Sequence, residues 1–92
     1  MIHLVVLRGN PPAMLTAVAA AKELANGWAM LAEGPSTDGK TAAMLVNAPQ
    51  SSEVLRNFLG KTTGLQILVV PLKPAWAAKG LPEIVETLLS MG

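Results

Sequence analysis

Four segments of this 92-residue chain alternate with the period of two that is typical of β-strands, yet both alternating sets of side chains are apolar. These segments are residues 2–7, 28–33, 41–47 and 65–70. A sheet that is apolar on both faces must be covered on both faces. Because only three further segments have helical patterns, we expect a second copy of the same sheet to supply the second cover, in a homodimer.

Helical patterns separate the predicted strands. Asn10 can cap a helix whose first turn holds two prolines, and the Asn26-Gly27 pair is typical of a helix that ends in the left-handed conformation. Ser51 or Ser52 can cap a second helix. Each cap follows a predicted strand, so strands and helices alternate along the chain.

The order of the predicted elements indicates the fold class. Residues 34–40 are rich in turn formers, so the second and third strands are expected to form a β-hairpin. The resulting order, β-α-β-β-α-β, is that of an α+β, ferredoxin-like core over residues 1–73. Residues 74–92 are expected to add an arm and a C-terminal helix, so that residues 1–92 form a single domain.

Alternation also divides the strand side chains between the two faces of the predicted sheet. One set has no polar member and is expected to pack against the helices: Ile2, Leu4, Val6, Met30, Ala32, Ala42, Met44, Val46, Leu65, Ile67 and Val69. The other set is apolar except for one polar side chain from each strand: His3, Glu33, Asn47 and Gln66. Each larger apolar side chain left in water would forgo about 1 to 3 kcal/mol, so we expect this second face to meet the partner sheet. The four polar side chains would then line a cavity.

Composition narrows the classes of partner. The net charge of +1 and the 14% of charged residues offer no basic stripe, so we expect no nucleic-acid partner. The absence of cysteine excludes disulfides and thiolate metal sites, and we expect neither a metal nor a cofactor. No apolar stretch reaches the roughly 18 to 20 residues that span a bilayer, and the first residues lack a signal-peptide pattern. We therefore expect no membrane partner and a cytoplasmic location.

Several runs of the sequence together resemble a known family. They are residues 27–39, 43–47, 51–53 and 69–73, and they include a Gly-Pro turn and an Asp-Gly pair. Over residues 2–73 the chain resembles the dimeric α+β barrel superfamily, especially its YCII-related and muconolactone-isomerase-like members. The resemblance implies two ferredoxin-like sheets packed into a barrel around a cavity for a small ligand.

The resemblance does not extend to the family's usual catalytic residues. YCII-related proteins typically carry a histidine in the first helix and an Asp-Pro pair after the second, and this chain has neither at the matching positions. Its only histidine, His3, is expected on the cavity face, where Glu33 could orient it as an acid or a base. An enzyme of this kind would be a cofactor-free isomerase or lyase, with Asn47 or Gln66 positioning the substrate. A structural histidine is the alternative.

A nucleotide-binding pattern is present as well. Residues 34–41 match the P-loop pattern G-x-x-x-x-G-K-[ST], whose backbone cradles phosphates at the start of a helix. The residues that follow have a strand pattern instead. Phosphate or nucleotide binding at Gly34 to Thr41 is therefore a remote alternative, and the tip of a hairpin is favoured.

Three further side chains are candidates for ligand contacts. Arg8, before the first helix, could hold an anion, although a capping turn explains the residues after it. Trp28 and Trp76 could bracket an aromatic ligand or serve as packing anchors. The sequence thus predicts a homodimeric barrel that binds a small, largely apolar organic ligand. A non-catalytic ligand-binding or regulatory module and a protein-interaction module are the alternatives.

Overall fold

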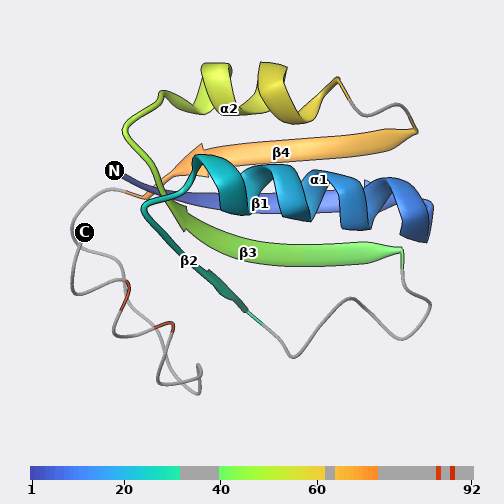
Figure 1. Ribbon diagram of the computed structural model, residues 1–92, viewed down its shortest axis with the longest axis horizontal. Helices are drawn as coiled ribbons and strands as arrows, with labels where there is room; N and C mark the ends of the chain where they lie inside the picture. The colour runs from blue at the N-terminus through green and yellow to red at the C-terminus, as the bar shows by residue number, and fades with distance from the viewer. Residues whose placement is uncertain (32–39, 62–63, 73–84, 86–87, 89–92) are drawn as a thin grey trace.

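A computed structural model describes residues 1–31, 40–61, 64–72, 85 and 88 of the chain. The element order is β1 (Ile2–Gly9), α1 (Pro11–Leu24), β2 (Gly27–Met30), β3 (Thr41–Asn47), α2 (Ser52–Leu59) and β4 (Leu65–Pro71). The four strands form one antiparallel sheet in the order β2-β3-β1-β4 (Figure 1). This confirms the predicted α+β class and element order, and it is compatible with a ferredoxin-like fold.

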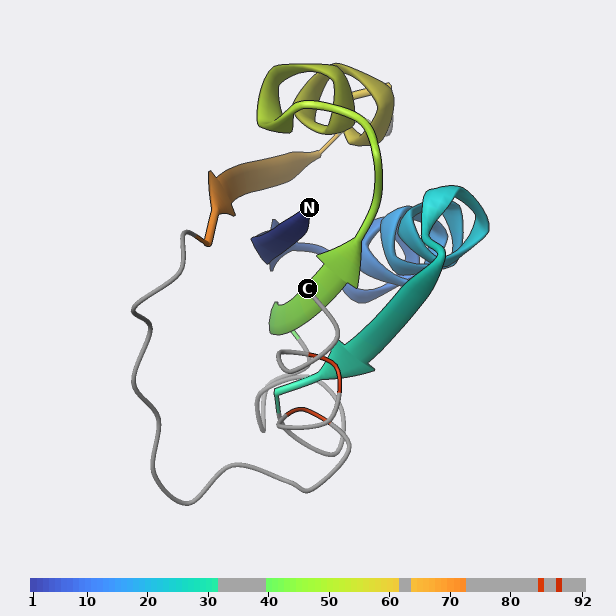
Figure 2. The same ribbon diagram turned by 90° about the vertical axis from the view of Figure 1, so that its left-hand side faces the viewer.

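Both helices lie on the same side of the sheet (Figure 2). The core between them and the sheet is apolar apart from His3, and its largest fully buried apolar side chains are Val5, Leu7, Met44, Val46, Leu55 and Leu59. Burying side chains of this size stabilises the fold by about 1.5 to 3 kcal/mol each. The helical layer therefore holds the sheet in place and leaves the opposite face of the sheet available.

The helix starts follow the predicted caps, but one predicted end is wrong. Asn10 caps α1 by accepting a hydrogen bond from the backbone N–H of Ala13 at 2.8 Å, and Ser51 caps α2 in the same way. The helix α1 ends at Leu24, two residues before Asn26, and Ala25 is already extended. The backbone N–H of Asn26 donates to the carbonyl of Asn47 at 2.7 Å, so pairing with β3 takes over the backbone where a left-handed helix end was expected.

The face assignment predicted for β1 is also wrong, by one residue. Val5 pairs with Met44 and with Val69, both on the helical side of the sheet, so His3, Val5 and Leu7 face the helices. The opposite set of β1 side chains, which was expected on the helical side, lies on the other face. The assignments of Met44, Val69 and their neighbours on the other strands are confirmed. Over residues 2–7, the range predicted for this strand, both sets are apolar apart from His3, so hydrophobic alternation alone cannot choose between them.

We call the sheet face that points away from α1 and α2 the open face. Part of it is covered by two helical residues near the C-terminus, Val85 and Leu88, which pack with Ile2, Ala29 and Leu45. The part formed by β1 and β4 remains accessible and carries the apolar strip, which we define as Val6, Leu68 and Val70. The open face, expected to meet only a partner sheet, is thus partly covered within the chain.

Candidate ligand-binding site

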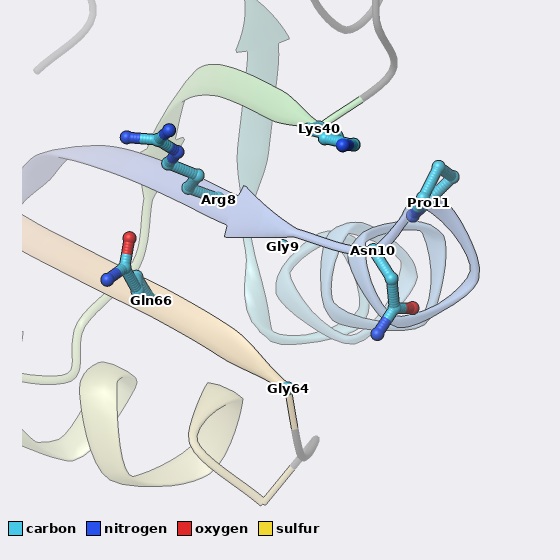
Figure 3. A pocket seen from close by; sticks show the side chains of 7 residues that line it. All are labelled: Arg8, Gly9, Asn10, Pro11, Lys40, Gly64 and Gln66. Carbon is cyan, nitrogen blue, oxygen red and sulfur yellow. The ribbon is translucent and has the colours of Figure 1, made fainter.

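Two of the predicted site residues meet on the open face. Arg8, near the end of β1, pairs with Gln66, near the start of β4, so their side chains leave the sheet on the same side (Figure 3). Both side chains are exposed. Neither makes an ion pair or a side-chain hydrogen bond with any other described residue. Their hydrogen-bonding groups are therefore available to a ligand.

Two hollows meet at this pair. The first, which we call the apolar hollow, has a volume of about 240 Å³ and is lined by Arg8 and Gln66 together with Val6, Ile67 and Leu68. The second, which we call the basic hollow, has a volume of about 430 Å³ and includes Lys40 in addition to Arg8 and Gln66. An apolar wall and a polar, positively charged wall thus lie side by side on one surface.

Glycine at position 9 fixes the approach of the two strands. Gly9 pairs with Leu65, and a Cβ atom on Gly9 would collide with the carbonyl oxygen of Gly64 and lie 2.7 Å from Leu65 Cδ2. Gly64 itself has a φ of +81°, a conformation that side chains disfavour. These two glycines let β4 begin directly against the end of β1. They thereby place Gln66 opposite Arg8.

Two positively charged side chains are among the described residues that line the basic hollow. Arg8 and Lys40 both line it, and among the described residues no aspartate or glutamate does. The side-chain oxygen of Asn10, another lining residue, is already engaged in capping α1. Opposite charge is attracted to such a surface, and an arginine fork matches the geometry of a carboxylate or phosphate.

The structure does not bring the other predicted site residues to these hollows. Asn47 pairs with Ile2, at the opposite end of β1 from Arg8, and its side chain accepts a hydrogen bond from the N-terminal amine at 3.3 Å. Arg8 lies six positions after Ile2 in the strand, which corresponds to a distance of about 20 Å. Trp28 pairs with Val46 on the helical side of the sheet, where Lys22 Nζ lies 4.0 Å from the centroid of the Trp28 ring. Glu33 and Trp76 lie outside the described residues.

His3 is on the helical side of the sheet, so its predicted place on the cavity face is wrong. The imidazole is fully buried. Nε2 lies 2.9 Å from the carbonyl oxygen of Gln50, which can only accept, so Nε2 carries the proton and donates. In the neutral ring Nδ1 then accepts from the hydroxyl of Ser52 at 3.0 Å. Burial of the ring, assisted by the positive N-terminus, holds the pKa of His3 below its ordinary value of 6.5.

No group of three or more acidic or histidine side chains that could hold a metal ion occurs in the described part of the chain. No described helix is long and apolar enough to cross a membrane. Thr41, the last residue of the P-loop pattern, begins a strand, as predicted, and not the helix that a P-loop requires. Residues 34–39 of that pattern lie outside the described ranges.

Comparison with known protein families, curated proteins and solved structures finds no match to this chain. The resemblance to dimeric α+β barrels therefore stays a prediction. The candidate site depends on geometry alone. The geometry adds Val6 and Leu68 to the site residues predicted from the sequence and brings Lys40, from the P-loop pattern, beside them. The sequence held a signal for Val6, because Val6 is two positions before Arg8 and therefore lies on the same face of the strand. A long charged side chain such as that of Arg8 belongs on an accessible face.

Proposed function

We propose that this protein binds a small, largely apolar organic ligand on its open face, and that two copies of the sheet face each other across the ligand. The observation that carries the proposal is the apolar hollow beside exposed Leu68. This leucine is 55% exposed although it lies on a regular strand next to Val6, and Val70 is 36% exposed. Exposed apolar side chains gathered beside a hollow are typical of a binding surface.

The homodimer follows from the same strip. A second copy turned by a twofold axis would set the apolar strip of each chain against that of its partner, and the association would remove apolar surface from water at about 25 cal/mol per Å². The C-terminal residues Val85 and Leu88 already cover Ile2, Ala29 and Leu45. The interface is therefore proposed for the β1 and β4 side of the open face, where the hollows lie.

The proposal is for binding and assigns no reaction. The one histidine of the chain is buried on the other side of the sheet, where both of its ring nitrogens are engaged by Gln50 and Ser52. The side chains at the hollows are suited to holding a ligand: an arginine, an amide and apolar groups. A non-catalytic ligand-binding module is therefore favoured over an isomerase or lyase that would use His3.

Amide NMR with a panel of small aromatic compounds tests this proposal. We expect saturable shifts confined to β1 and β4 around Val6, Arg8 and Leu68. The variant Leu68→Gln should weaken these shifts. The matched control is Leu15→Gln, which changes another exposed leucine, 68% exposed on α1, and should leave them unchanged. The proposal is overturned if no compound shifts these amides, or if the two variants bind alike.

A further inference from the structure

We propose that the ligand is a small organic anion, whose charged group is held by Arg8 and Gln66 while its apolar body lies against Val6 and Leu68. This inference depends on the proposed binding function and specifies the class of ligand. It fits a carboxylate or a phosphate ester carried on a ring or a short branched chain. The two sources share the same requirement, an oxyanion next to an apolar body.

The first support is the availability of the arginine. Arg8 is exposed, and no described residue forms an ion pair with it. Arg56, the other arginine of the chain, is in contrast within 3.9 Å of the Glu53 carboxylate and donates to the side chain of Asn57 at 3.0 Å. A guanidinium has only hydrogen-bond donors and keeps its positive charge. Arg8 is therefore complementary to an anion, which offers both acceptors and the opposite charge.

The second support is the spacing of the two side-chain pairs. Arg8 pairs with Gln66. Val6 pairs with Leu68 on the same face, two residues away from the first pair in each strand. Two residues of antiparallel strand span about 7 Å. A single ring or a chain of a few carbons bridges that distance, so one compact molecule reaches both pairs. The Gln66 amide can donate to one oxygen of the anion while the arginine fork binds the other.

The third support is the charge around the pair. Lys40 lines the basic hollow beside Arg8, and its backbone carbonyl, which accepts from the N–H of Gly9 at 2.9 Å, ties that residue to the end of β1. Arg8 and Lys40 therefore both line the place where the anion would lie. Positively charged side chains attract anions, most strongly at low ionic strength.

Titration calorimetry and amide NMR with four probes test the inference. Benzoate and phenyl phosphate supply the anion and the ring, benzamide supplies the ring without the charge, and acetate supplies the charge without the ring. We expect either aromatic anion to bind at least tenfold more tightly than benzamide and than acetate. We expect Arg8→Gln to weaken the aromatic anions by about 10- to 100-fold, the range for hydrogen bonds to charged groups, with little effect on benzamide.

The matched control is Arg56→Gln, which removes the same charge from α2, on the other side of the sheet. It should leave all four affinities unchanged. The inference that the ligand is an anion is overturned if benzamide binds to β1 and β4 as tightly as benzoate does, or if the two arginine variants lose affinity equally. The proposed binding function is not overturned by either result. If none of the aromatic probes shifts these strands, both proposals fail. The tighter of the two aromatic anions identifies the carboxylate or the phosphate as the preferred group.

Discussion

Replacing His3 with leucine should flatten the dependence of stability on pH below about pH 6.5. His3 is the single histidine of the chain and is fully buried, so no other histidine titrates in this range. Leucine is of similar size and is apolar, so it keeps the packing of β1 against α2. It does not keep the two hydrogen bonds to Gln50 and Ser52.

The loss of stability expected for His3→Leu at neutral pH follows from the absence of those two hydrogen bonds. The carbonyl of Gln50 would lose its donor in a partly buried place, which costs about 1 to 3 kcal/mol. The Ser52 hydroxyl is partly accessible and can turn to water, so its contribution is smaller. For a domain of this size, each kcal/mol lowers the melting temperature by about 4 to 8 °C.

The sign of the pH dependence follows from the lowered pKa. In the folded protein the lowered pKa means that the ring takes up its proton at a lower pH than in the unfolded chain, where it does so near pH 6.5. Unfolding therefore binds a proton as the pH falls below 6.5, and the stability that is present above this pH is lost as the pH approaches the folded pKa. The slope reaches at most about 1.4 kcal/mol per pH unit for one proton.

Urea unfolding of the wild type and of His3→Leu, at several pH values from 5 to 8 and at one protein concentration, measures both effects. The wild type should lose stability below pH 6.5. The variant should be less stable at pH 7 and flatter between pH 5 and 7. Equal slopes in the two proteins would refute the reasoning, because the loss would then come from groups other than His3.

Two further predictions concern the end of β1 and the start of α1. Gly9→Ala should lower the melting temperature markedly and displace β4, because the added Cβ meets the backbone of Gly64. The same change at Gly27, where Leu88 is the one described residue close to the added Cβ, should cost less; differential scanning calorimetry compares the two variants. Asn10→Ala should cost about 1 kcal/mol through loss of the bond to the N–H of Ala13, and Asn10→Ser should restore most of it in urea unfolding.

Much of the fold could be predicted because separate signals agreed. Asn10 and the prolines after it gave the start of α1, Ser51 gave the start of α2, and β3 begins and ends as its pattern predicts. The length and the alternating pattern of the strands predicted a sheet with two apolar faces. Agreement between local caps and the larger pattern is what makes an element predictable from sequence.

The face of β1 could not be predicted from the alternation of residues 2–7, because His3 is the only polar side chain among them. A polar residue was expected to avoid the core, but Gln50 and Ser52 satisfy both nitrogens of His3 and allow it to be buried. Those partners are about fifty positions away and depend on the packing of α2. Arg8 held the decisive signal at the other end of the strand, since its exposed side chain marks the open face.

The candidate site was predicted in part for the same reason. Arg8 and Gln66 were singled out separately, one as an anion contact near a helix start and the other as a polar residue on the second face. Their pairing depends on the register of β1 with β4, which the close approach of Gly9 and Leu65 fixes. A register between strands that are distant in the chain is a property of the folded sheet and is not encoded in either strand alone.

The mass in solution, measured by light scattering after size exclusion over a range of concentrations, tests whether two open faces pair. We expect twice the chain mass of 9.6 kDa, a shift toward the single-chain mass for Leu68→Gln on dilution, and no shift for Leu15→Gln. A mass of 9.6 kDa at every concentration would contradict the paired open faces, as would a dimer that both variants leave intact.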